Sequence, residues 1–287
     1  MTESQHRLEG LEPDNLLALL ALVGLMRALD ASGELGAVRI AWSVDDPPVR
    51  PVLHLPDPAD RAAVLGATAG GIRQLTEAHE FDRRGLTFTS DEGRERLLQA
   101  RDSSPELWAA LLSDAAVSRD GMTLRATPLC LQLGAGHQHF LTRLADVPTL
   151  AEPPSRRPRR GPRISEECSL AEALFRRWRR PDATQSFRWD HQEDLRYALR
   201  ATNPADPTAR ATTQHGANRL AAVGLPVFVV APERGANGRV RLAFRGGGMD
   251  AEGRRTVTVQ RMPTVVEALD PLRTRSELDS WITTHVK

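Results

Sequence analysis

The 287-residue sequence has almost no lysine and little cysteine. Lys287 is the only lysine, so nearly every basic residue is an arginine. Arginine suits bidentate phosphate contacts. Codon usage in a GC-rich genome explains the same bias, however, and the abundant alanine, glycine and proline favour that explanation. The two cysteines, Cys130 and Cys168, are too few for a disulfide framework or a thiolate zinc site and fit a reducing compartment.

The sequence also lacks the marks of export and of membrane insertion. Its first residues, MTESQHR, have no basic region followed by an apolar stretch, so we expect no signal peptide. The longest apolar run, Leu16 to Met26, is too short to cross a bilayer. We therefore expect a cytoplasmic protein with no membrane partner.

No pattern typical of an enzyme is present. The sequence has no glycine pattern for a dinucleotide or a phosphate loop, and no nucleophile, base and orienting group can be nominated together. We therefore expect a protein that is not an enzyme, with no catalytic residue, no cofactor and no metal. The formal net charge is only +1, so any surface for nucleic acid must come from local segregation of charge.

Apolar spacing predicts a helix-rich α+β fold with short antiparallel strands. A helix starts at Asn15 and ends at Ser32-Gly33, and its leucines occupy nearly the whole circumference, which is typical of a buried helix. Further helices are expected at 57–81 (interrupted at Gly70-Gly71), 91–101, 105–117, 130–144, 169–180, 193–200, 217–224 and 276–282. Strands are expected at 38–42, 49–55, 86–88, 122–126, 226–231, 239–244 and 254–261.

A proline-rich segment, E-P-P-S-R-R-P-R-R-G-P at 152–162, interrupts this pattern. Proline lacks an amide donor and restrains the residue before it, so the segment is neither helix nor central strand. We interpret residues 151–165 as an exposed Arg/Pro-rich linker between two subdomains. The N-terminal one, residues 1–150, is a helix-rich α+β domain, and the C-terminal one, residues 166–287, is also α+β.

Arginine is concentrated in this linker and the helix after it. Between residues 156 and 180 there are nine arginines and three acidic residues. The predicted nucleic-acid-binding residues are Arg156, Arg157, Arg159, Arg160, Arg163, Arg176, Arg177, Arg179 and Arg180, because guanidinium groups grip phosphates in fixed geometry. Two structural alternatives remain open: a solvated spacer, and arginines that offset a helix dipole. Trp178 either stacks on a base or belongs to the core.

Two further motifs place polar side chains beside glycine. G-A-G-H-Q-H-F (134–140) contains His137 and His139, and H-G-A-N-R-L-A (215–221) contains His215, Asn218 and Arg219. The exposed amides of a helix start favour an anion near Asn218 and Arg219, although a buried role for Asn218 is an equal alternative.

We expect these five residues to form a polar contact site. The spacing of His137 and His139 argues against a metal site if they lie on a helix. The alternative enzyme interpretation is a metal-dependent nuclease that uses His137, His139, Asp190 and His191.

Four segments of the sequence resemble proteins encoded in type I-G (formerly I-U) CRISPR loci, the Cas8-like or helicase-extension family. They are P-D-N-L-L-A-L-L-A-L-V-G-L-M-R-A-L (13–29), P-L-C-L-Q-L-G-A-G-H-Q-H-F-L (128–141), F-R-W-D-H-Q-E-D-L-R-Y-A-L-R (187–200) and H-G-A-N-R-L-A-A-V-G-L-P (215–226). The segments are short and rich in leucine and alanine, and the chain is short for a complete large subunit.

The resemblance implies a non-catalytic subunit of a CRISPR RNA-guided DNA surveillance complex, a Cascade-type assembly for antiviral defence. In such complexes guide pairing reads the target, while protein reads a short flanking motif and holds the opened strands. The implied partners are CRISPR effector subunits, guide RNA, target DNA and the helicase-nuclease. The subunit would contact target-DNA phosphates, recruit the helicase-nuclease, or do both. A pure protein-interaction adaptor remains a further alternative.

Overall fold

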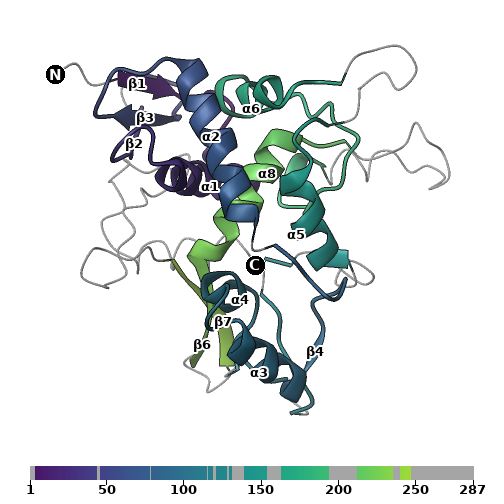
Figure 1. Ribbon diagram of the computed structural model, residues 1–287. Helices are drawn as coiled ribbons and strands as arrows, with labels where there is room; N and C mark the ends of the chain where they lie inside the picture. The colour runs from purple at the N-terminus through teal and green to yellow at the C-terminus, as the bar shows by residue number, and fades with distance from the viewer. Residues whose placement is uncertain are drawn as a thin grey trace. The chain divides into compact units, whose positions relative to one another are not determined.

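The computed structural model describes residues 4–43, 46–77, 79–114, 116–118, 121–127, 129–130, 139–153, 163–193, 212–234 and 240–246, with only the backbone at 231–234 and 240–246. These residues form helices and short antiparallel strands, which confirms the α+β class (Figure 1). The elements expected at 254–261 and 276–282, and all but the first residue of the helix expected at 193–200, lie outside the described residues.

The chain forms two compact units that alternate along the sequence. The first unit contains the described residues of Met1–His79 and Arg143–Gly224, and the second unit those of Glu80–Thr142 and Leu225–Arg261. This division differs from the expected break at residues 151–165. The reason is that segments distant in the sequence pack together, since α1 (Leu16–Ser32) has its most extensive helix contact with α8 (His215–Gly224).

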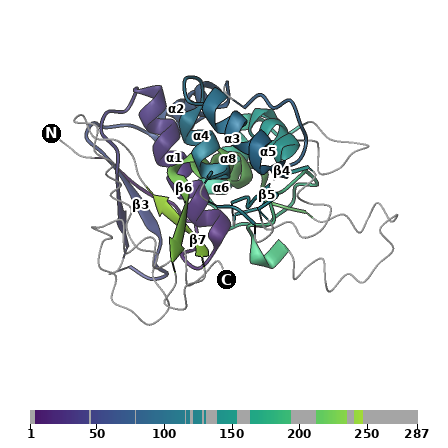
Figure 2. The same ribbon diagram turned by 90° about the horizontal axis from the view of Figure 1, so that it is seen from below.

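Helix α1 has the bounds and the environment that the sequence predicts. The Asn15 side chain accepts from the Ala18 amide at its start, and Gly33 ends it in the left-handed conformation with φ of 67°. Its contact with α8 depends on glycine, because a Cβ on Gly24 would lie 1.8 Å from the Leu220 carbonyl oxygen. Both views show α8 beside α1 (Figures 1 and 2).

Helix α2 (Arg61–Thr76) runs without a break through Gly70-Gly71, so the predicted interruption is wrong. Glycine costs helix stability, but here it permits a close helix contact. A Cβ on Gly71 would lie 1.8 Å from the carbonyl oxygen of Ala28 in α1. Gly71 therefore marks the place where α2 packs closely on α1.

The first unit also contains a small sheet with strand order β1-β3-β2. The strands expected at 38–42 and 49–55 are present as β2 (Arg39–Trp42) and β3 (Pro51–Leu55), which pair antiparallel. Strand β1 (Ser4–Arg7) pairs with the other edge of β3 and was not expected, because S-Q-H-R has no apolar alternation. Helix α6 (Glu166–Phe175) and residues 143–149 of α5 (Phe140–Thr149) complete this unit.

The second unit has its described core around Trp108. Its elements are β4 (Phe88–Thr89), α3 (Ser90–Gln99), α4 (Pro105–Leu111), β5 (Thr123–Leu124), the 3-10 helix η3 (Leu225–Val227), β6 (Phe228–Arg234) and β7 (Val240–Gly246). Phe81 and Phe88 meet the Trp108 ring edge-on, with centroids 5.9 and 5.8 Å away. Strands β6 and β7, which correspond to the strands expected at 226–231 and 239–244, pair antiparallel. Among all described helices, none is long and apolar enough to span a membrane.

Candidate functional site: an arginine-lined pocket

The arginine-rich segment after α6 is extended rather than helical. The sequence predicts a helix to residue 180, but α6 ends at Phe175, and Arg176 has φ of −132° and ψ of 145°. Exposure then alternates: Arg177 and Arg179 are exposed, whereas Trp178 and Arg180 are buried. The segment therefore presents arginine to solvent between two inward-pointing side chains.

Trp178 is one of these two anchors. It is 7% exposed, and its indole Nε1 donates to the Ala173 carbonyl of α6 at 2.8 Å. The N-terminal segment closes over it, because a Cβ on Gly10 would lie 2.8 Å from Nε1. The indole is core, so of the two interpretations of Trp178 the structure supports the core one over base stacking.

Arg180 is the second anchor, and it does not belong to the predicted phosphate-binding surface. It is 6% exposed, and its Nε and Nη2 donate to the two carboxylate oxygens of Asp190. Asp190 is fully buried and also accepts from the Asn15 side-chain amide at 2.9 Å. The sequence could not separate Arg180 from its exposed neighbours, because its partner lies ten residues further on.

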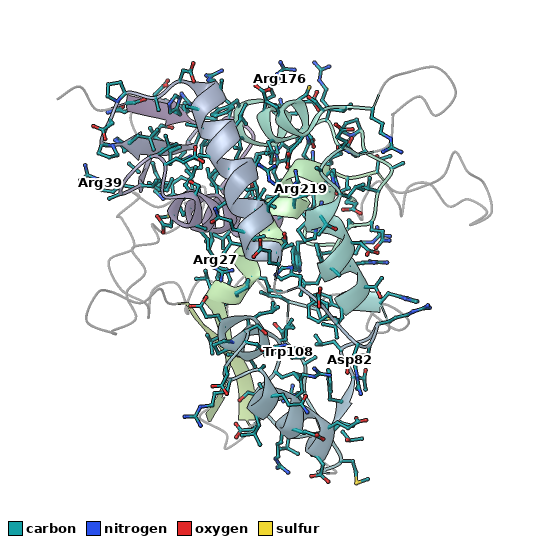
Figure 3. All side chains as sticks on the ribbon, in the orientation of Figure 1. Arg27, Arg39, Asp82, Trp108, Arg176 and Arg219 are labelled. Carbon is teal, nitrogen blue, oxygen red and sulfur yellow. The ribbon has the colours of Figure 1, made fainter. Side chains whose placement is uncertain are left out.

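The exposed arginines line a pocket of about 610 Å³ within the first unit. Its lining residues are Glu9, Glu172, Phe175, Arg176, Arg177, Trp178, Arg179 and Gln214. Arg176 lies 3.9 Å from Glu172, and within the described part of the chain Arg177 has no ion-pair partner. Figure 3 shows Arg176 on the outer side of α6, whereas Arg219 lies among the helices.

The remaining arginines of the predicted set do not join this pocket. Arg163 is exposed, but it precedes α6 and so lies beyond the opposite end of that helix from Arg176. Arg156, Arg157, Arg159 and Arg160 lie outside the described residues. The structure therefore brings Arg176, Arg177 and Arg179 together.

The expected anion site at the start of α8 is already occupied by the protein itself. A carboxylate oxygen of Asp182 accepts from the His215 amide at 3.1 Å, which satisfies the favourable helix start. Asn218 is 1% exposed. It accepts from the Phe187 amide and donates to Thr213 Oγ1 at 2.8 Å, so it holds loops onto α8. The buried alternative for Asn218 is the one observed.

His215 and Arg219 are also buried, so neither belongs to an exposed polar contact site. His215 Nε2 donates to the Leu150 carbonyl at 2.7 Å, and burial lowers the pKa of this histidine to about 4. Arg219 donates to the Pro148 carbonyl and to Glu166 at 2.7 Å. Both side chains bind α8 to neighbouring segments, and burial lowers the pKa of Arg219 despite its carboxylate partner.

The histidines of the first motif do not complete a site with these residues. His139 is exposed and belongs to the second unit, and His137 lies outside the described residues. Asp190, a ligand in the nuclease alternative, has both oxygens bonded to Arg180, and His191 beside it is exposed. Among the described residues no three His, Cys, Asp or Glu side chains gather as a metal would require.

Sequence reasoning missed three polar members of the pocket: Glu9, Glu172 and Gln214. Glu9 and Gln214 are far from the arginines in sequence and meet them only through the packing of the N-terminal segment and of the α8 start against α6. Glu172 was available as an i,i+4 partner of Arg176.

The protein matches no known family model, no curated protein and no solved structure.

Proposed function

We propose that this protein binds nucleic acid through the phosphates that Arg176, Arg177 and Arg179 hold. The observation that carries the proposal is three exposed arginines along one pocket. Guanidinium groups offer forked donors to phosphate oxygens, and each phosphate contact releases counterions. The net charge of the whole chain is close to zero, so this local cluster is what would attract a polyanion.

The anchoring of the segment supports the proposal. Trp178 and Arg180 are fixed by hydrogen bonds on either side of Arg179. A backbone held in this way loses less conformational freedom when its arginines bind a ligand, so the cost of ordering on binding is small. A merely solvated arginine run gains nothing from two buried anchors.

For the biological setting, we propose a non-catalytic subunit of a type I-G CRISPR surveillance complex acting in the cytoplasm. The support is the resemblance of the four sequence segments to Cas8-like and helicase-extension proteins. In that setting the pocket arginines contact target-DNA or guide-RNA phosphates beside other effector subunits, and another surface recruits the helicase-nuclease.

The test is a triple substitution, Arg176→Gln, Arg177→Gln and Arg179→Gln, in the full chain. Binding to a labelled 20-base-pair duplex is followed by fluorescence anisotropy over a series of salt concentrations. The slope of log K against log salt is negative, and loss of three phosphate contacts should reduce its magnitude by up to about 2.7. Binding at low salt should weaken at least roughly tenfold.

A matched control removes the same charge elsewhere. Arg39, Arg94 and Arg101 are exposed and do not line the pocket, so their triple glutamine variant should retain most of the affinity. Equal losses in the two variants would mean that only net charge matters. Unchanged binding in the pocket variant would overturn the proposal, and no binding by either variant or the wild type would favour the adaptor alternative.

A further inference from the structure

The pocket lining contains one buried polar side chain besides the three exposed arginines. Gln214 is 1% exposed and lines the pocket. Its Oε1 accepts from the Arg180 amide at 3.3 Å. Its Nε2 has no hydrogen-bond partner in the part of the chain that the structure describes, yet this nitrogen is not sealed from solvent. An amide donor that the described protein does not use is available to a ligand that enters the pocket.

The size and the charge of the pocket narrow the ligand class. A volume of about 610 Å³ matches sites for small molecules, and Gln214 in its lining is buried whereas the three arginines are exposed. Arg176, Arg177 and Arg179 supply positive charge, and the carboxylates of Glu9 and Glu172 supply acceptors. A ligand with a phosphate and with hydroxyl or amine donors satisfies both kinds of group.

We propose that the pocket takes the phosphorylated end of a nucleic-acid strand, one nucleotide deep, with Gln214 Nε2 donating to the phosphate. This inference rests on the proposed function and adds to it, because a site for internal phosphates alone has no preference for chain ends. The orientation of Gln214 is set by the Arg180 amide, which uses the oxygen and leaves the nitrogen for the ligand.

The experiment compares three 12-mer oligonucleotides of one sequence, with a 5′-phosphate, a 3′-phosphate or hydroxyls at both ends. One phosphorylated end should bind about tenfold more tightly than the hydroxyl form, the range of a hydrogen bond to a charged group. The two phosphate positions distinguish which end is held. Equal affinity for all three oligonucleotides overturns the inference, even where duplex binding survives.

The diagnostic variant is Gln214→Glu. This variant keeps the oxygen that accepts from the Arg180 amide and replaces the donor nitrogen by an anionic oxygen. It should therefore abolish the end preference, which is the ratio of the affinity for the phosphorylated oligonucleotide to that for the hydroxyl form. Gln74→Glu adds the same charge at an exposed position of α2 in the same unit and should keep that preference. A persistent end preference in Gln214→Glu overturns the assigned role.

A second variant guards against misfolding of Gln214→Glu. Glu172→Gln removes a carboxylate from the pocket wall and should strengthen the end preference, because it removes repulsion from the phosphate. A weaker end preference in this variant counts against the inference. If a labelled mononucleotide binds the wild type but no oligonucleotide or duplex does, the proposed function fails while the pocket assignment survives.

Discussion

Arg180 and Asp190 form a two-point ion pair in the interior of the first unit, with Nε and Nη2 of the guanidinium donating to the two carboxylate oxygens. Arg180 adopts this position with φ of 52°, a left-handed backbone that costs energy for a residue other than glycine. The same carboxylate binds Asn15, which starts α1. One buried acid thus connects the arginine segment to the start of α1.

Asp190→Asn should therefore destabilise the protein strongly. The variant leaves Arg180 buried without a counter-charge, a change that costs about 3–5 kcal/mol in buried pairs. The measurement is the free energy of unfolding from urea titration at pH 7. Asp14→Asn removes an exposed acid at the same helix start and should change stability by less than about 0.5 kcal/mol. Similar values for the two variants would contradict this account of the ion pair.

Substitution of Gly24 should separate helix packing from helix propensity. Gly24→Ala places a methyl group against the Leu220 carbonyl of α8 and should cost about 1–3 kcal/mol or more through overpacking. Gly66→Ala on α2 meets no atom within 4 Å and should instead stabilise by about 0.5–1 kcal/mol. Thermal denaturation of the two variants should therefore shift Tm in opposite directions. Stabilisation by both would mean that α1 and α8 are not in close contact.

Acid should destabilise the protein through two buried histidines. Burial lowers the pKa of His79 and of His215 to about 4, below the ordinary value of 6.5. Protons therefore bind the unfolded chain first, so the contribution of each neutral histidine is complete above pH 6.5 and is lost as pH falls toward 4. Urea titrations from pH 7.5 to 4.5 should show stability falling across this window.

The histidine variants make that pH dependence specific. In the wild type, each buried histidine adds up to one proton to the difference between the unfolded and the folded state over this window. His79→Gln and His215→Gln should each remove that proton, so the stability of each variant should fall less steeply with acid. Subtraction from the wild-type curve removes the carboxylates common to all forms, including Glu193, whose pKa burial raises. Parallel curves for wild type and both variants would contradict the assignment.

In the second unit, Thr89 should matter more than its exposed neighbour. Its side chain accepts from the Glu92 amide while Glu92 accepts from the Thr89 amide, so the two residues close the start of α3. Thr89→Ala should cost about 1 kcal/mol, whereas Thr87→Ala at an exposed position should cost little. Urea denaturation checks both, and equal costs would exclude the cap as the cause.

Local signals in the sequence predicted local structure well. Asn15 and Gly33 gave the ends of α1, because capping depends on a few adjacent residues. The glycines of α2 misled, because only tertiary packing decides whether a glycine breaks a helix or admits a neighbour. Strand β1 had no apolar alternation to detect, and its partner β3 lies some fifty residues away.

The candidate site was predictable only in part, for a related reason. The four arginines between residues 176 and 180 look alike in sequence, but Arg180 pairs inward with Asp190, whereas the other three are exposed. Arg219 is buried by its pairing with Glu166, fifty-three residues earlier. Charge density indicated where arginine gathers, whereas long-range partners determine which arginines a ligand can reach.

The alternation of the two units along the chain bears on how the protein is made. Helix α1 leaves the ribosome early with apolar side chains on nearly every face, whereas α8, which covers it, begins only at His215. Between them the ribosome produces Glu80–Thr142 of the second unit. Until α8 has been synthesised, the apolar side chains of α1 that pack on it remain exposed. Chaperones that bind unfolded chains can protect such a surface during synthesis. A fragment that ends at residue 150 contains α2 but lacks α8, so the side of α1 that packs on α8 would stay exposed and the fragment is expected to aggregate.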